Sequence, residues 1–315
     1  MSRAFRRAVS KYLNIAALCL VMPAFATASG AQDLEVTLLG TGDPQPSVDR
    51  FGPSTLVRAG GLVVLVDAGR GAIQRLTQLG VSYADVDAVL LTHFHSDHLA
   101  GLPDLWLTGW LISGRDRPLK VFGPAGTREL VEGLRQAFAF DVGIRVQDDR
   151  APAAGAQIEV VEIKEGVVLE DEGVRVQAFD VDHRPIVPAL GYRIDFRGRS
   201  VVISGDTRFS PNLIEKARGV DLLVHEVGDA PPEVLARDED VRRVVAHHTR
   251  AADVGRVFAT VKPKLAVFSH LTLLGGFSVA NLVDSARSTY AGPLVVGQDL
   301  MRFIVSDQIT VIALR

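Results

Sequence analysis

Residues 90–103 read LLTHFHSDHLAGLP, and this stretch decides the fold. It places three histidines and one aspartate within six residues, namely His93, His95, Asp97 and His98. The preceding run, AVLLT at 88–92, is typical of a buried strand. Because side chains alternate along a strand, His93 and His95 can point to the same side, while Asp97 and His98 fall on the turn into a helix. One compact loop therefore offers four potential metal ligands.

Three more candidate ligands lie at the ends of apolar runs elsewhere in the chain. His183 ends FDVDH at 179–183, Asp206 ends the apolar run of VVISGDT at 201–207, and His270 ends LAVFSH at 265–270. Ligands at successive strand ends converge on one edge of a sheet. Imidazole and carboxylate suit zinc or a similar divalent ion, and these groups exceed what one tetrahedral ion uses. The sequence thus predicts two adjacent metal ions, and the alternative is a surface or pH-sensitive histidine cluster.

Short apolar runs separated by turn signals continue along the chain. The expected strands cover 34–39, 62–67, 88–92, 119–122, 157–163, 174–179, 191–196, 200–204, 220–225 and 265–270. The expected helices cover 125–138, 250–260 and 277–287. The same rhythm returns after about residue 155, which indicates two β-rich halves with outer helices, an α/β fold of the αββα sandwich type. No linker divides residues 32–315, so we expect them to form a single domain.

Residues 1–31 have the features of a signal peptide. A basic start with Arg3, Arg6, Arg7 and Lys11 precedes a mostly apolar run at 13–25, and small residues follow it. The alternative, an uncleaved membrane anchor, needs about 20 apolar residues, which is longer than this run. We therefore expect cleavage after Ala28 or Ala31, a periplasmic or secreted protein, and no membrane contact once the signal is removed.

Composition narrows the range of functions. With 47% hydrophobic and 23% charged residues in 315, the chain is an ordinary globular one, which excludes disordered and fibrous classes. Removing the signal changes the formal net charge from −3 to −7 and removes the only cysteine, Cys19. The remaining chain can hold a metal only through nitrogen and oxygen. It also lacks the overall basic charge that supplies most nucleic-acid affinity, so we expect no nucleic acid partner.

The sequence HxHxDH at 93–98, the later histidine, the GDT motif and the final strand-terminal histidine resemble the metallo-β-lactamase superfamily. The resemblance extends from about residue 34 to residue 300. It implies two divalent ions, with zinc the expected metal and manganese or iron left open. The implied ligands are His93, His95 and His183 for one ion, Asp97, His98 and His270 for the other, and Asp206 as a bridge. The absence of a cysteine near the bridge argues against antibiotic hydrolysis.

Flanking motifs resemble one branch of that superfamily, which contains tRNA 3′-processing endonucleases (ribonuclease Z) and metal-dependent arylsulfatases. These motifs are LLGTGDPQP at 38–46, VDAG at 66–69, GPAGT at 123–127, GYRIDF at 191–196, LLVHE at 222–226 and AHHT at 246–249. The resemblance implies that Asp67 accepts the N–H of a ligand histidine, and that Glu226 and His247 assist the leaving group. The alternatives are a polar strand end for Asp67 and a structural hydrogen bond for the pair. His225 and His248 receive no role.

The expected substrate follows from what the chain lacks. Only 22 residues separate His183 from Asp206, which leaves no room for the long arm that grips tRNA in this branch. The favoured function is therefore that of an exported hydrolase whose metal-bridged hydroxide attacks a small-molecule ester, an aryl sulfate or phosphate ester. The alternatives are a lactone or thioester hydrolase, a ribonuclease Z-like phosphodiesterase, and a metal-storing protein without turnover. Homodimer formation is left open.

Two apolar features flank the expected site. Trp106 and Trp110 lie four residues apart on an expected helix, where they either line an aryl pocket or pack the helix onto the sheet. The apolar stretch LTLLGGF at 271–277 is a second candidate wall, with Gly275 and Gly276 permitting movement.

Overall fold

A computed structural model of the protein describes residues 34–313. The expected signal peptide, residues 1–31, and Cys19 within it lie outside the described residues. Among the described residues, no helix combines the length and the apolar character needed to cross a bilayer.

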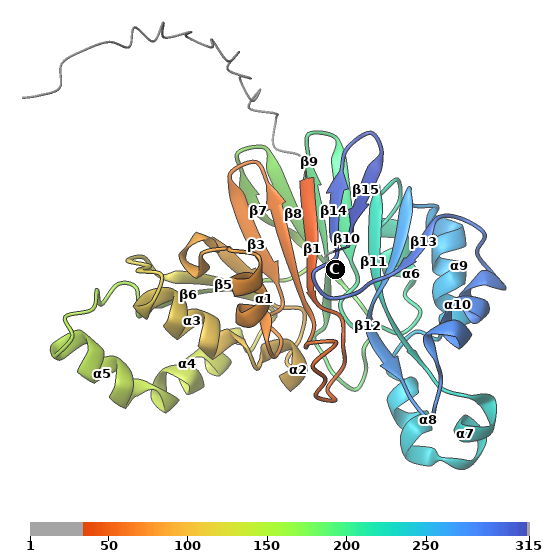
Figure 1. The fold of residues 1–315 in the computed structure, drawn as a ribbon, viewed down its shortest axis with the longest axis horizontal. Coiled ribbons are helices and arrows are strands. Elements are labelled where there is room, and N and C mark those ends of the chain that lie inside the picture. The colour runs from red at the N-terminus through yellow and green to blue at the C-terminus, as the bar shows by residue number, and fades with distance from the viewer. Residues whose placement is uncertain (1–33, 314–315) are drawn as a thin grey trace, which may run out of the picture. The chain divides into compact units, whose positions relative to one another are not determined.

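The first sheet has eight strands in the order β15-β14-β1-β2-β3-β4-β5-β6. Their bounds are β1 (Leu34–Gly40), β2 (Ser54–Ala59), β3 (Leu62–Val66), β4 (Ala88–Leu90), β5 (Leu119–Gly123), β6 (Ile158–Glu162), β14 (Arg302–Val305) and β15 (Ile309–Ile312). Strands β3 to β6 run parallel, whereas β1 pairs antiparallel with both β2 and β14. The first and the last described strands therefore share one sheet (Figure 1).

The second sheet has seven strands in the order β13-β12-β11-β10-β9-β8-β7. Their bounds are β7 (Gly166–Asp171), β8 (Val174–Asp180), β9 (Leu190–Phe196), β10 (Arg199–Ile203), β11 (Leu222–Asp229), β12 (Leu265–Leu273) and β13 (Leu294–Val296). Strands β10 to β13 run parallel, and β7 to β10 form an antiparallel meander. The hairpin of β9 and β10 fills the short interval between His183 and Asp206, so that interval carries no inserted arm.

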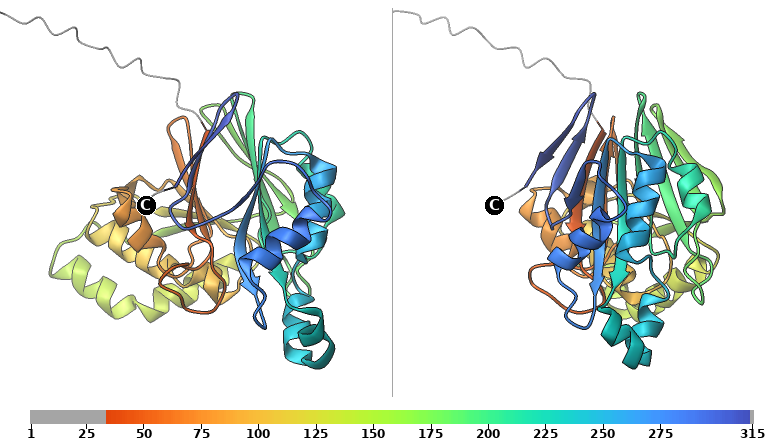
Figure 2. Two further views of the ribbon diagram at one scale, coloured as in Figure 1. Left: turned by 45° about the vertical axis from the view of Figure 1, so that its right-hand side comes forward. Right: turned by 90° about the vertical axis from the view of Figure 1, so that its right-hand side faces the viewer.

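Helices cover the outer face of each sheet (Figure 2). The helical segments of the first half are α1 (Ala72–Gln78), the 3-10 helix η1 (Tyr83–Asp85), α2 (Ser96–Leu99), α3 (Leu102–Leu111), α4 (Thr127–Ala137) and α5 (Ala139–Gln147). Those of the second half are α6 (Pro211–Lys216), α7 (Pro232–Arg237), α8 (Glu239–Val245), α9 (Ala251–Val261) and α10 (Val279–Arg287). The expected αββα sandwich is confirmed.

Three apolar clusters hold these layers together. The central one lies between the two sheets and includes Tyr192, Ile194 and Phe303, all fully buried. A second cluster packs α9 and α10 against the second sheet, and a third packs α1, α3 and α4 against the first. Each apolar face is buried against another layer, which is the physical reason for the four-layer arrangement.

All ten expected strands and all three expected helices are present, with ends that differ by a few residues. The strands that the sequence did not predict are β2, β7, β13, β14 and β15. Strands β7, β13 and β15 contain no buried residue, and their apolar stretches are only a few residues long, which makes them hard to recognise as strands.

Candidate metal centre

The loop after β4 presents four of the expected ligands. His93, Asp97 and His98 are buried, and His95 is half-buried at the N-cap of the single-turn helix α2. The β4 strand ends at Leu90, so His93 and His95 leave the sheet edge in extended backbone before α2 turns Asp97 and His98 back toward them. The local sequence thus folds into a strand, a short loop and a helical turn, as the motif predicts.

The remaining expected ligands arrive at the same edge from the second sheet. His183 follows β8 and Asp206 follows β10, each three residues after the strand ends. One group of ligand atoms comes from His93, His95, His183 and Asp206, and a second comes from Asp97, His98 and His270; within each group all atoms lie within 4.8 Å of one another. The structure therefore brings all seven predicted ligands together.

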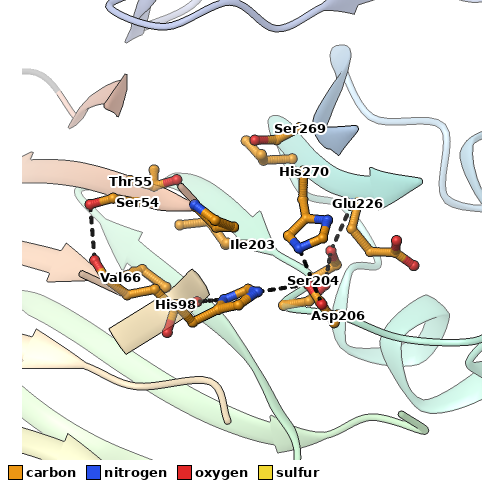
Figure 3. Close-up of a pocket in the computed structure, with 14 residues that line it drawn as sticks. Ser54, Thr55, Val66, His98, Ile203, Ser204, Asp206, Glu226, Ser269 and His270 are labelled. Atoms are coloured by element: carbon orange, nitrogen blue, oxygen red, sulfur yellow. Dashed lines mark hydrogen bonds and ion pairs between the residues drawn. The ribbon is translucent and has the colours of Figure 1, made fainter. Parts of the chain in front are cut away.

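Asp206 lies between the two groups. Its Oδ1 is 3.3 Å from His98 Nε2, and its Oδ2 is 3.3 Å from His270 Nε2 and 3.7 Å from His93 Nε2. Figure 3 shows His98 and His270 pointing toward Asp206, and their two rings are stacked with centroids 5.1 Å apart. The preceding Gly205 has φ +60°, and a Cβ there would lie 2.4 Å from the carbonyl oxygen of Leu190. Only glycine fits this turn, which aims Asp206 into the cluster.

His270 does not end its strand, contrary to the sequence expectation. Strand β12 continues to Leu273, and the pairing of β11 with β12 shifts register between His225 and Val227. At this bulge His270 has φ +44°, a left-handed conformation that non-glycine residues seldom adopt. The bulge redirects one side chain of a buried strand, so His270 faces the cluster while the strand goes on past it.

Hydrogen bonds on the side away from the cluster orient three of the histidines, His93, His98 and His183. Nδ1 of His98 donates to Asp67 at 2.7 Å, and Nδ1 of His183 donates to the carbonyl oxygen of His247 at 2.9 Å. Nδ1 of His93 lies 2.9 Å from the Thr92 hydroxyl, which itself donates to Asp67. Asp67 is placed as the resemblance implies. These bonds fix the tautomers so that Nε2 of each ring faces the centre.

The electrostatics of the cluster suit divalent cations. Burial lowers the pKa of His183 to about 4, so its imidazole is neutral, as a metal ligand must be. Burial of His270 would lower its pKa, but Asp206 and the hydrogen bond to Asp97 raise that pKa to about 9. Two buried carboxylates thus create a negative field that a cation would satisfy.

Unpaired buried atoms test whether the residues fit metal ions. Nε2 of His93, Nε2 of His98 and Oδ1 of Asp206 are buried without a hydrogen-bond partner in the described chain. Such groups are costly unless something else satisfies them, and all three converge on one point of the cluster. The donor set of imidazole nitrogens and carboxylate oxygens, without sulfur, fits divalent metal ions.

Glu226 pairs with His248, so the expected pairing of Glu226 with His247 is wrong. Nδ1 of His248 lies 2.9 Å from Glu226 Oε2, and the Thr249 N–H donates to Oε1 at 2.8 Å. His248 also approaches the ligand atoms of Asp206 and His270 within 4.8 Å. Burial alone would lower the pKa of His248, but the charge of Glu226 and its hydrogen bond raise that pKa. The sequence does not distinguish His247 from His248, because their side chains are identical. The course of the backbone between α8 and α9 decides that the ring of His248 faces Glu226.

His247 and His225 take supporting positions. His247 is half-exposed, and it contributes its backbone carbonyl to His183 rather than its ring to Glu226. His225 is fully buried, and its Nδ1 donates to the Glu226 carbonyl oxygen at 2.7 Å.

The two tryptophans pack helix α3 rather than line the site. Trp106 and Trp110 are each 1% exposed, and their indole N–H groups donate to the carbonyl oxygens of Ala156 and Pro152. The packing alternative therefore holds. The apolar stretch 271–277 was the second candidate wall. Its first three residues, 271–273, belong to strand β12, so only the short turn that follows the strand is a loop.

The fold and this cluster define a class, the metal-dependent hydrolases built on two facing sheets. Residues 63–271 match the beta-lactamase superfamily domain. A relative from Mycobacterium marinum named "Ribonuclease Z" is 39% identical over 275 residues, which cover 85% of this chain and 98% of the relative. The chain belongs to the metallo-β-lactamase superfamily.

Solved structures repeat the fold. A metallo-beta-lactamase fold protein from Bacillus subtilis aligns with a TM-score of 0.68 and 19% identity, over 86% of this chain and 98% of its own. The short form of human tRNase Z aligns with a TM-score of 0.63 and 23% identity, over 85% and 98% of the two chains. At these identities the likeness is one of fold.

The expectation of a small-molecule ester substrate without any nucleic acid partner is wrong. Relatives that share 37–39% identity with the chain over nearly their whole length carry the name ribonuclease Z. The expectation rested on the export signal, on the missing arm and on net charge. Net charge averages over the whole surface, whereas a nucleic acid responds to the local potential where it binds.

Proposed function

We propose that the protein is a ribonuclease Z-like phosphodiesterase that hydrolyses phosphodiester bonds in RNA. The observation that carries the proposal is that the Glu226–His248 pair lies next to the cluster of seven candidate ligands. The chain also aligns with relatives named ribonuclease Z along 97–98% of their length. Hydrolysis of a phosphodiester needs a nucleophile, charge stabilisation and a proton for the leaving oxygen, and this arrangement provides a place for each.

The cluster would hold two divalent ions, for which zinc is our expected metal. When bound, such ions activate water at neutral pH and stabilise charge on the phosphate oxygens. The protein's part is to hold its ligands in place. Asp67 and the His247 carbonyl orient the imidazoles of His98 and His183. The two oxygens of Asp206 lie within 3.7 Å of histidine nitrogens from both ligand groups.

The second part of the reaction falls to His248. Glu226 holds Nδ1 of His248, so Nε2 is the nitrogen left to face the substrate. Burial lowers the pKa of His248, but the charge of Glu226 and its hydrogen bond outweigh this effect and raise the pKa, which favours the protonated ring. A protonated imidazole can give that proton to the departing 3′-oxygen, which is general acid catalysis.

The test is a comparison of substrates with purified protein. We expect cleavage of a tRNA precursor with a 3′ extension and of the chromogenic diester bis(p-nitrophenyl) phosphate, both abolished by chelation and restored by zinc. We expect p-nitrophenyl sulfate to react far more slowly. Metal-loaded protein that leaves RNA intact while hydrolysing the sulfate would overturn the proposal.

A further inference from the structure

A cavity of about 400 Å³ adjoins the metal centre and has no role in the function proposed so far. Its walls include Arg208, Phe209, Leu235, Arg242, His248 and Arg250. Its volume falls within the range of small-molecule sites, roughly 300–1,000 Å³. His248 belongs both to this wall and to the ligand cluster, so a molecule that fills the cavity reaches the centre through His248.

The cavity is positively charged although the chain is acidic overall. Three arginines and one carboxylate, Asp253, line its walls. Arg250 is ion-paired with Asp229 and Asp253 with Arg256, whereas Arg208 and Arg242 have no ion-pair partner among the described residues. Each arginine uses only some of its N–H donors in hydrogen bonds within the protein. Arg208 Nη2 donates to the Arg184 carbonyl oxygen, and Arg242 Nη1 donates to the Leu235 carbonyl oxygen. Arg250 Nε donates to the carboxylate of Asp229. Nε of Arg208 is buried without a partner in the described chain. Guanidinium groups with spare N–H donors are suited to phosphate.

The same cavity has an apolar side. Phe209 is 43% exposed, although it lies beside buried residues at the start of α6, and Leu235 and Val245 lie near it in the wall. An exposed phenyl ring beside arginines is the arrangement on which a nucleic-acid base stacks while its phosphate is held by charge.

We propose that this cavity, which we call the arginine pocket, binds one nucleotide of the RNA next to the scissile phosphate, on the His248 side of the bond. The inference rests on the proposed function and adds to it the place where the substrate is held. The short α7 and α8 helices supply Leu235, Arg242 and Val245, and they project beyond the ends of the sheets at the lower right of Figure 1. The pocket would allow the chain to bind RNA without an inserted arm.

The chain offers matched controls for both kinds of contact. Arg242 and Arg243 are neighbours on α8 and both are exposed, but Arg243 pairs with Glu239 and does not line the pocket. Phe140 on α5 is 83% exposed and lies outside the pocket, so it serves as the control for Phe209. All four side chains are on the surface, and truncating them leaves the three apolar clusters intact.

The first measurement is calorimetric binding of adenosine monophosphate, which contains no phosphodiester bond, to the metal-loaded full chain. We expect Arg242→Ala and Phe209→Ala to weaken binding about tenfold or more, and Arg243→Ala and Phe140→Ala to leave it unchanged. The second is the KM for cleavage of single-stranded RNA, which should rise in the same two variants and stay constant in the two controls.

The outcomes separate the pocket from the proposed function. No binding of adenosine monophosphate, or equal binding by Arg242→Ala, Phe209→Ala and their controls, would overturn the pocket even if RNA is cleaved. Binding that follows the expected pattern in a protein that cleaves no RNA would overturn the proposed function and retain the pocket as a nucleotide site.

Discussion

Asp206 is the residue on which both halves of the metal centre depend. It is 2% exposed, and its two oxygens face histidines from both ligand groups. Burial would raise its pKa, but the neighbouring His270 and His98 hold the pKa of this carboxyl well below its usual range. These histidines therefore favour the ionised form of the carboxyl group.

Replacing this carboxylate tests its bridging position. We expect Asp206→Ala to lose both ions and to reduce turnover about a thousandfold or more, because neither ligand group keeps a shared anion. Metal content by atomic spectroscopy and the rate with bis(p-nitrophenyl) phosphate are the measurements. A variant that retains both ions and full turnover would remove the bridge from the mechanism.

The histidine that pairs with Glu226 is open to an equally direct test. We expect His248→Ala to lower kcat for RNA about 10²- to 10⁴-fold, the usual range for losing a general acid. The loss should be smaller with bis(p-nitrophenyl) phosphate, because nitrophenoxide departs without a proton. His247→Ala is the control, since its ring makes no contact with Glu226. Equal losses for the two substrates would argue against proton donation by His248.

For individual residues, the sequence predicted the site well where the chemistry of the site restricts the choice of side chain. The seven residues of the cluster could be predicted because a metal site accepts few residue types, and each of these residues follows or ends an apolar run in the sequence. The choice between His247 and His248 could not be predicted, since only the turn from α8 into α9 decides which ring faces Glu226. The arginine pocket was also missed, because its members come from segments far apart and arginines are common on surfaces.

Helix α3 shows how an element can look functional in sequence and be structural in the fold. Trp106 and Trp110 are spaced as a pocket wall would be, yet both face inward and donate to the segment before β6. Apolar residues four apart are also what any buried helical face presents, and here the packing interpretation explains both indole hydrogen bonds.

Substitution at Trp106 separates packing from catalysis. Trp106→Phe keeps the ring in the cluster but leaves the carbonyl oxygen of Ala156 without its donor. We expect the free energy of unfolding to fall by about 1–3 kcal/mol, as measured by denaturant titration. We expect kcat/KM to remain at the wild-type value. A rise in KM with an unchanged free energy of unfolding would instead show that Trp106 contacts the substrate.

Among the elements, the longest buried strands were predictable, whereas the edge strands β7, β13 and β15 and the internal strands β2 and β14 were not. Strands β11 and β12 are buried along nearly their whole length and stand out as apolar runs. The bulge that turns His270 inward could not be predicted from the sequence, because it arises from the pairing of two strands and not from either strand alone.

For the molecule as a whole, net charge is a poor guide to partners. The chain carries a formal net charge of −3, yet three arginines gather in one cavity beside the metal centre. The layered architecture could be predicted from the rhythm of the strands, whereas a local concentration of charge depends on how distant segments meet, which composition does not record.

The compartment in which the protein acts is also a property of the whole chain. We propose that it is exported, from the basic start and apolar run within residues 1–31. Expression of the full chain in a bacterium should yield periplasmic protein that begins at Ser29 or Gln32, as read by mass spectrometry. Full-length protein that stays in the cytoplasm would contradict this.

The pairing of β1 with β14 has a consequence for biosynthesis. One edge of β1 finds its partner only when residues 302–305 leave the ribosome, some 260 residues after β1 itself. A nascent chain therefore carries an open strand edge, a template for unwanted association, through most of its translation. Chains that terminate before Arg302 retain every proposed metal ligand but keep that edge, and their fate should be inclusion bodies rather than a smaller active enzyme.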